Sequence, residues 1–337
     1  MKQLFSILAV CSLLLLAACG SANEPAAAGK HNDENAGKKV IKIGIAQYAE
    51  HPSLDGARAG FLQALKDAGY KENVNLQVDM HNAQGDMNNN MTIAQKLVGD
   101  KNDLILAIAT PTALAVAKAT KDIPVLFTAV TDPVASKLVK SLEEPGGNVT
   151  GTRDTNPEAI KKTMETMKRF FPDAKKVGVI YNSGEQNSVV NIANVKQVLQ
   201  GGGLEIVEAT VTNSSEVKQA ADSLVGRADI IYLPSDNTVI SALSSVVSVA
   251  NAKDIPLFCE SSESVGQGAF ASVGFQYYDL GYTTGKMAVE VLKGASPAQM
   301  PVRFSEQLDL MINPKAAEEQ GITLTEDMKQ GAILIEK

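Results

Sequence analysis

The sequence predicts an α/β protein made of two similar lobes, each a parallel sheet with helices on both faces. Predicted strands and helices alternate from Val40 onward, which is typical of crossover units in parallel sheets. Residues 103–133 contain an apolar run, a small polar loop, an alanine-rich helix and a second apolar run, and the same order returns from Asp229. The tetrapeptide Lys-Asp-Ile-Pro occupies the same place in both copies, at 121–124 and 253–256. We therefore expect two lobes of similar architecture.

The predicted elements of the first lobe are three strand–helix pairs followed by two further strands. Apolar residues keep helical spacing between Pro52 and Gly69, and alternate in the strand manner from Val74 to Met80. A turn over residues 82–86 leads into the second helix. The remaining strands are expected at 40–46, at both ends of 103–133 and, as a short connecting strand, at 149–153.

The second half of the chain repeats this order and then continues beyond it. Strands are predicted at 177–181, 204–211, 229–233 and 269–275, with two short ones in 303–312; helices are predicted from Asn156 and at 188–199, 215–224 and 278–292. The extra elements indicate that the lobes exchange C-terminal segments. We expect lobe 1 to comprise 39–149 plus 274–306 and lobe 2 to comprise 150–273 plus 307–337, with a hinge at the three crossings. Two independent tandem domains are the alternative.

The N-terminus has the features of a lipoprotein signal. Lys2 precedes an apolar run over 4–18 that is too short to span a membrane and ends in Leu-Ala-Ala-Cys, which resembles a bacterial lipobox. We expect a signal peptide over 1–18, acylation of Cys19 by fatty acids such as palmitate, and a flexible tether over 19–38. An ordinary secretory signal is the alternative.

Composition and charge exclude several classes of function. The 337 residues are 45% hydrophobic and carry a net charge of −7, so the chain is globular and has no basic face for nucleic acid. Beyond the signal peptide and the tether, Cys259 is the only cysteine, which rules out an intrachain disulfide in the body. The sequence contains no Gly-x-Ser-x-Gly, no His-Glu-x-x-His and no zinc-binding cysteine pair, so we expect neither an enzyme nor a cofactor or metal. His51 and His81 are expected to be surface or loop residues.

Polar residues follow the predicted strands at the edge where open parallel sheets bind ligands. Hydroxyls and N–H groups at helix starts can bind a carboxylate or simply cap the helix. An aspartate at such a position can pair with an ammonium or act as a cap. A tyrosine can stack on a planar group or pack against the hinge. The candidate binding residues are Gln47, Tyr48, Thr110, Thr112, Asp132, Asp154, Asn187, Ser188, Asp236 and Asn237.

These motifs together resemble the ABC-transporter substrate-binding lipoproteins of the tryptophan/tyrosine branch. The resemblance covers residues 40–337 and rests on the lipobox and on Gln47-Tyr48, Asn-Ala-Gln-Gly-Asp at 82–86, Ala-Thr-Pro at 109–111, Ala-Val-Thr-Asp-Pro at 129–133, Tyr-Asn-Ser-x-Glu-x-Asn-Ser at 181–188, Pro-Ser-Asp-Asn at 234–237 and Leu-Gly-Tyr-x-x-Gly-x-Met-Ala at 280–288. It implies a periplasmic-binding-protein type I fold, with two Rossmann-like lobes, three crossings between them and a cleft that closes on one amino acid. It also implies that the ligand carboxylate meets Thr110, Thr112, Asn187 and Ser188, and the ammonium meets Asp236, Asn237 and Asp154; for the ring we favour Tyr48.

The function expected from this resemblance is capture of an aromatic amino acid outside the cell. The implied partners are an ABC permease and its ATPase subunit, and the protein is expected to be a monomer that contacts the membrane only through its lipid anchor. Two alternatives remain: the same type of receptor with another solute, such as a branched amino acid, a nucleoside or a sugar, or a surface sensor or adhesin that transports nothing.

Overall fold

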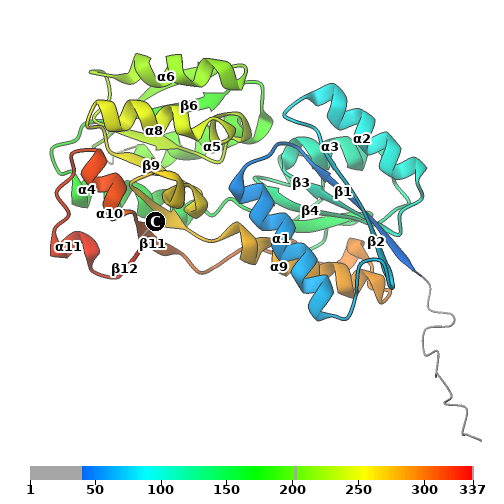
Figure 1. Cartoon of the computed structure of the whole chain (residues 1–337). Helices are drawn as coiled ribbons and strands as arrows, with labels where there is room; N and C mark the ends of the chain where they lie inside the picture. The colour runs from blue at the N-terminus through cyan, green and yellow to red at the C-terminus, as the bar shows by residue number, and fades with distance from the viewer. Residues whose placement is uncertain (1–39, 201–202, 336–337) are drawn as a thin grey trace, which may run out of the picture. The chain divides into compact units, whose positions relative to one another are not determined.

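The computed structural model of the chain describes residues 40–200 and 203–335, and its strands form two sheets, each with its own helices (Figure 1). The predicted acylation site at Cys19 and the tether lie outside the described residues. None of the described helices combines the length and the apolar character that crossing a bilayer requires.

The first sheet has the strand order β2-β1-β3-β4-β5, and all of its strands are parallel. Its strands are β1 (Ile41–Gln47), β2 (Leu76–Asn82), β3 (Leu104–Ile108), β4 (Val125–Val130) and β5 (Val149–Arg153). The helices of this lobe are α1 (Pro52–Asp67), α2 (Met87–Gly99), α3 (Thr110–Ala119) and, from much later in the chain, α9 (Tyr277–Leu292).

The second sheet has the order β12-β11-β10-β9-β8-β6-β7 and is parallel except where β10 meets β11. Its strands are β6 (Lys176–Asn182), β7 (Glu205–Val211), β8 (Ile230–Leu233), β9 (Leu257–Cys259), β10 (Ala271–Gly274), β11 (Asp309–Ile312) and β12 (Ala332–Leu334). Its helices are α4 (Pro157–Phe170), α5 (Gln186–Leu199), α6 (Val217–Leu224), α7 (Asn237–Ser241), α8 (Leu243–Ala252), α10 (Pro314–Glu319) and α11 (Glu326–Lys329).

The predicted repeat is present in the hydrogen bonding as well as in the strand order. The order β2-β1-β3-β4 in one sheet corresponds to β7-β6-β8-β9 in the other. In the first copy the carbonyl of Pro124 accepts from the backbone N–H of Ile105 at 3.0 Å, and in the second the carbonyl of Pro256 accepts from Ile231 at 2.9 Å. The Lys-Asp-Ile-Pro segments therefore begin equivalent strands in the two lobes.

Both sheets are buried on both faces, as the apolar runs predicted. Alternate residues of β3 belong to different apolar clusters, with Leu104 and Leu106 on one face and Ile105 on the other. The second sheet follows the same rule, since Ile231 of β8 packs on one face and Tyr232 on the other.

Helix α9 follows β10 of the second sheet in sequence but packs against α1 of the first lobe, as Figure 1 shows in blue and orange. The contact is close because glycines replace side chains: a Cβ at Gly281 would lie 1.8 Å from the carbonyl oxygen of Ala57, and one at Gly60 would lie 2.0 Å from that of Tyr278. Gly60 and Gly281 therefore serve helix packing.

The chain leaves the first sheet later than the predicted boundary at 149–150. Strand β5 pairs with β4 as far as Arg153, across a register shift between Phe127 and Val130, so the first crossing follows Arg153. Of the two short strands expected in 303–312, only β11 forms; Arg303 makes an isolated bridge with Thr152 of the first lobe. Strand β12, which the sequence did not predict, completes the second sheet.

Candidate functional site

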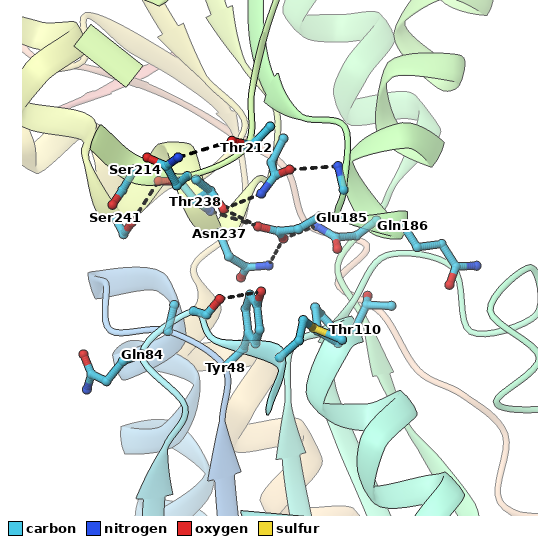
Figure 2. A pocket seen from close by; sticks show the side chains of 18 of the residues that line it. Tyr48, Gln84, Thr110, Glu185, Gln186, Thr212, Ser214, Asn237, Thr238 and Ser241 are labelled. Carbon is cyan, nitrogen blue, oxygen red and sulfur yellow. Dashed lines mark hydrogen bonds between the residues drawn. The ribbon is translucent and has the colours of Figure 1, made fainter. Parts of the chain in front are cut away.

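A cavity of about 710 Å³ lies at the carboxyl ends of the strands of both sheets, and we call it the outer cleft. Figure 2 shows Tyr48, Gln84 and Thr110 on one side of it and Glu185, Asn237 and Thr238 on the other. The wall from the first lobe includes the apolar side chains of Tyr48, Met87, Pro111 and Leu114, whereas the wall from the second lobe is mainly polar, with Asn182, Ser183, Glu185, Gln186, Asn187, Thr212, Asn213, Ser214, Asn237, Thr238 and Ser241.

A second cavity of only about 20 Å³, which we call the inner chamber, lies next to the outer cleft. Thr110, Asn187 and Asn237 line both cavities. The inner chamber is further lined by residues that include His51, Ser53, Thr131, Asp154, Ser235, Ser261 and Tyr277. A volume of this size holds about one water-sized group.

Three residues that line the inner chamber carry a buried polar atom without a hydrogen-bond partner in the described part of the chain. These atoms are Asp154 Oδ1, Asn187 Oδ1 and His51 Nδ1. Buried polar groups in native proteins are nearly always hydrogen-bonded, so unpaired atoms that share one small chamber need an explanation. A ligand with several donor groups would supply it.

The carboxylate of Glu185, at the N-cap of α5, is enclosed by donors. Its Oε1 accepts from the backbone N–H of Thr238 at 3.1 Å and from the Thr238 hydroxyl at 2.7 Å. Its Oε2 accepts from Nδ2 of Asn237 at 2.6 Å and from Nδ2 of Asn187 at 3.2 Å. Glu185 is only 4% exposed, so these bonds replace its hydration.

His51 joins the two lobes at the inner chamber. Its Nε2 lies 3.5 Å from Oδ1 of Asn237, and the hydroxyl of Ser53, in the first turn of α1, lies 2.6 Å from that of Ser261. Burial lowers the pKa of His51 to about 4, since desolvation outweighs the opposing effects of Asn237 and Asp55. The imidazole is therefore neutral near pH 7.

Asp154 lies just past the end of β5 at the first crossing, and its Oδ2 accepts from the hydroxyl of Tyr277 at 2.9 Å. Tyr277 begins α9, and its hydroxyl also lies 2.9 Å from that of Ser235. Burial raises the pKa of Asp154 to about 6, against the opposing hydrogen bond from Tyr277. Burial, and then the charge of Asp154, raise the pKa of Glu260 to about 7. In the described part of the chain no Lys or Arg lines the inner chamber, so this region favours a cation.

Helices α1, α3 and α5 begin at these cavities without a side-chain cap. Helix α9 also begins there, but its first N–H, that of Tyr277, donates to the side chain of Glu263. In front of α3, Ala109 adopts a φ of 79°, which an alanine tolerates only under constraint. An uncapped helix N-terminus presents backbone N–H groups and a partial positive charge, and this combination suits a carboxylate. The site therefore offers acceptors to a cation and helix N-termini to an anion within a short distance.

The structure brings six of the ten residues predicted from the sequence to one of the two cavities and leaves four outside their lining. Tyr48, Thr110, Asp154, Asn187, Asp236 and Asn237 line a cavity. Gln47 instead donates to Asp55 and to the carbonyl of Ala49, Thr112 donates to Asn90, Asp132 accepts from the N–H groups of Val134 and Ala135, and Ser188 donates to Asp236. The hydroxyl of Tyr48 donates to the carbonyl of Gly85 at 2.9 Å, which leaves its ring in the outer cleft.

Asp236 reaches the inner chamber, but protein donors already occupy its carboxylate. Oδ1 accepts from the N–H of Val239, and Oδ2 accepts from the N–H of Asn182 and the hydroxyl of Ser188, both at 2.6 Å. The role given to it from the resemblance, pairing with an ammonium, fits Asp154 better, because Asp154 has an unpaired oxygen.

The binding residues predicted from the sequence do not include His51, Glu185 or Tyr277. His51 lies in the loop before α1, which is one of the two expected placements, but it is buried at 7% exposure and does not lie on the surface. Glu185 could have been noticed as a carboxylate in a loop after a strand, but nothing local shows that Tyr277 reaches Asp154. Within residues 40–200 and 203–335, no group of His, Cys, Asp and Glu is arranged to hold a metal ion.

Comparison with known proteins assigns the chain to a family. Residues 42–334 match the family model of ABC transporter substrate binding proteins. A tyrosine-binding protein of Clostridioides difficile strain R20291 is 45% identical over 314 residues, which cover 93% of this chain and 90% of that protein.

Two solved structures are similar over most of the chain. An ABC domain from Streptococcus pneumonia in complex with L-Trp is 38% identical, with a TM-score of 0.83 over 87% of this chain and 99% of that one. The ligand-free, open structure of a substrate-binding protein with adhesive properties from Clostridium difficile is 43% identical, with a TM-score of 0.67 over 88% of this chain and 99% of that one. The fold is that of type I periplasmic binding proteins. With its two parallel-sheet lobes and its match from residue 42 to 334, the chain belongs to the family of ABC transporter substrate-binding proteins.

Proposed function

We propose that this protein is the receptor of an ABC importer for an aromatic amino acid, either tyrosine, tryptophan or phenylalanine. The observation that carries the proposal is the pair of cavities: a small chamber with unpaired buried acceptors beside a larger cleft with one apolar wall. The similarity to a tyrosine-binding protein and to a complex with L-Trp supports this ligand class.

The ammonium group occupies the inner chamber. An ammonium has three N–H donors and no acceptor, which suits a chamber where Asp154 and Asn187 each present an unpaired oxygen. The carboxylate of Asp154 supplies the compensating charge.

The carboxylate group lies at the start of α3, where Thr110 lines both cavities. The uncapped N-terminus of α3 contributes N–H donors, and the start of α1 at Ser53 and Leu54 faces the same chamber.

The aromatic ring extends into the outer cleft. Tyr48, Met87, Pro111 and Leu114 give it an apolar surface on the first lobe. A phenol hydroxyl or an indole N–H at the far end would find polar partners in the segment Thr212–Ser214 of the second lobe.

Both lobes contribute to these contacts, so binding is coupled to closure of the hinge. The described arrangement is more similar to the L-Trp complex than to the open, ligand-free relative, although the sequence is closer to the latter.

The receptor acts on the extracytoplasmic face as a monomer, held to the membrane by acyl chains on Cys19. It delivers its amino acid to a permease whose ATPase subunit hydrolyses ATP, and it makes or breaks no bond itself. Replacing Cys19 by alanine should release the protein from the membrane fraction, and retention of this variant in membranes would contradict the anchor.

Calorimetry and thermal shift with the purified protein test the ligand class. L-tyrosine, L-tryptophan or L-phenylalanine should raise the Tm and show saturable binding, because a ligand that binds only the folded state stabilises it. Glucose, leucine and a nucleoside are the comparison set for the alternative solutes. Binding of one of these in preference to every aromatic amino acid, or no binding at all, would overturn the proposal.

Adhesion is a second candidate, favoured by the relative described as a substrate-binding protein with adhesive properties. It does not require loss of amino-acid binding. Attachment of the purified protein to cultured host cells, with and without saturating tyrosine, tests it, and attachment no greater than that of albumin would reject it.

A further inference from the structure

The orientation of the amides around Glu185 is decided by chemistry. A carboxylate only accepts hydrogen bonds, so each amide that faces Glu185 must present its NH₂ end. Asn187 and Asn237 both approach the same oxygen, Oε2, at 3.2 and 2.6 Å. The Nδ2 of Asn187 also faces the carbonyl oxygen of Ser235 at 3.4 Å, another pure acceptor, which fixes the same orientation.

The amide oxygens of these two asparagines consequently point away from Glu185. Oδ1 of Asn187 is the unpaired buried atom described above, on a residue that lines the inner chamber. Oδ1 of Asn237 faces Nε2 of His51 at 3.5 Å.

The orientation of Asn237 in turn selects the tautomer of His51. A neutral imidazole carries its proton on one nitrogen and a lone pair on the other. Since Nε2 faces an amide oxygen, the proton belongs on Nε2, and the unpaired Nδ1 holds the lone pair. His51 is neutral near pH 7 because burial lowers its pKa to about 4.

We propose that Glu185 is a positioning residue that sets the hydrogen-bond polarity of the inner chamber. By accepting from both asparagines, it orients Asn187 so that Oδ1 is available to the ligand, and it fixes the tautomer of His51 that leaves the lone pair on Nδ1. These two acceptors join Asp154 Oδ1 around the ligand. The inference rests on the proposed function and deepens it, because it defines the substrate class. The chamber accepts a protonated amine and rejects analogues that place a carbonyl or hydrogen there, such as 2-oxo acids and des-amino acids.

Glu185→Gln is the decisive variant because it keeps the shape and changes one acceptor into a donor. The backbone N–H of Thr238, which only donates, holds the acceptor oxygen of the new amide at the Oε1 position. Its NH₂ group then faces Asn187 and Asn237, and both amides must turn over or lose their partner. Glu185→Asp, which keeps the acceptor polarity, is the matched control.

Two ligands separate a polarity effect from general damage: L-tyrosine and its des-amino analogue 3-(4-hydroxyphenyl)propionate, or L-tryptophan and indole-3-propionate if tryptophan binds better. In the wild type, the amino acid should bind far more tightly than the analogue. In Glu185→Gln this preference should fall about tenfold or more, since one hydrogen bond to a charged group contributes about that factor. Glu185→Asp should retain most of it. An equal loss for both ligands, or an unchanged preference, would overturn the inference.

NMR of ¹⁵N-histidine-labelled protein gives a readout that needs no ligand. The signals of His51, identified with a His51→Gln variant, should show the proton on Nε2 in the wild type and a change of tautomer in Glu185→Gln. A wild-type proton on Nδ1, or identical spectra in both proteins, would contradict the inference. If the wild type binds no aromatic amino acid, the proposed function fails, whereas the tautomer measurement still tests Glu185.

Discussion

Asp154→Asn should move stability and affinity in opposite directions. The carboxyl is buried, and its pKa rises from 3.8 to about 6, so keeping it ionised near neutral pH costs the ligand-free protein about 3 kcal/mol at 1.4 kcal/mol per pKa unit. The amide has the same shape and can still accept from Tyr277, but it has no charge. The variant without ligand should therefore be more stable than the wild type, by up to about 2 °C in Tm for each kcal/mol.

The same substitution should weaken amino-acid binding. An ammonium loses its only charged partner among the three unpaired acceptors, which is worth roughly 1.5–3 kcal/mol, or about tenfold to more than a hundredfold in Kd. Calorimetric unfolding of the ligand-free protein and titration with tyrosine or tryptophan measure the two effects. Asp132→Asn is the control, because Asp132 is a carboxylate just after a strand of the same sheet but lies outside both cavities. An amide there can still accept from the N–H groups of Val134 and Ala135, so the substitution should change neither quantity by much.

The pH dependence of the difference provides an internal check. The pKa of Asp154 is higher in the folded state than in the unfolded chain, so between about pH 4 and 6 the folded protein holds a proton that the unfolded chain has lost. The contribution of Asp154 to stability is therefore lost as the pH rises through that range and does not change further above it. The Tm advantage of Asp154→Asn should thus be present at neutral pH and vanish near pH 4. The affinity of the wild type for the amino acid should fall as the pH drops below about 6, where Asp154 takes up a proton, and the affinity of the variant should fall less. A lower Tm at neutral pH together with unchanged affinity would refute the assignment of Asp154.

Three further substitutions test the ring surface, the packing of the lobe and the role of Asp236. Tyr48→Ala should weaken binding of the aromatic ligand by about 1 kcal/mol or more, while Tyr48→Phe, which loses only the bond to a backbone carbonyl, stays within about twofold; equal affinities in titration calorimetry would remove the ring from the site. Gly281→Ala should lower the stability by about 3 kcal/mol, because its Cβ would lie 1.8 Å from a backbone oxygen, whereas Gly99→Ala has open space; equal melting temperatures would contradict the close packing of α1 and α9. Asp236→Ala should lower the Tm by several degrees, since three donors lose their acceptor at about 1 kcal/mol each, and an unchanged Tm would show that its bonds do not stabilise the lobe.

Much of the architecture is determined by local sequence patterns. Alternating strand and helix periodicities define crossover units, and the repeated segments place Pro124 and Pro256 at equivalent strand starts. Because the carboxyl ends of parallel strands share one edge of a sheet, the sequence indicates that the loops at Tyr48 and Asn237 each lie at the ligand-binding edge of their own lobe.

The crossings between the lobes could be anticipated only approximately. The boundary near residue 150 falls within β5, since nothing in the short segment Val149–Arg153 reveals which sheet it will join. Its partner strand β4 and the bridge between Thr152 and Arg303 are long-range pairings, and only the folded chain decides them.

Only the tertiary structure decided which polar atoms in the cleft remain available to a ligand. Thr110 and Thr112 look alike in the sequence, yet one lines both cavities and the other donates to Asn90. Asp236 and Asp154 are both buried acids near strand ends, but one is fully bonded and the other keeps a free oxygen. The physical reason is that hydrogen-bond saturation depends on partners far along the chain. The sequence therefore identified loops that line the two cavities, and the packing of the two lobes determined which of their polar atoms stay unpaired.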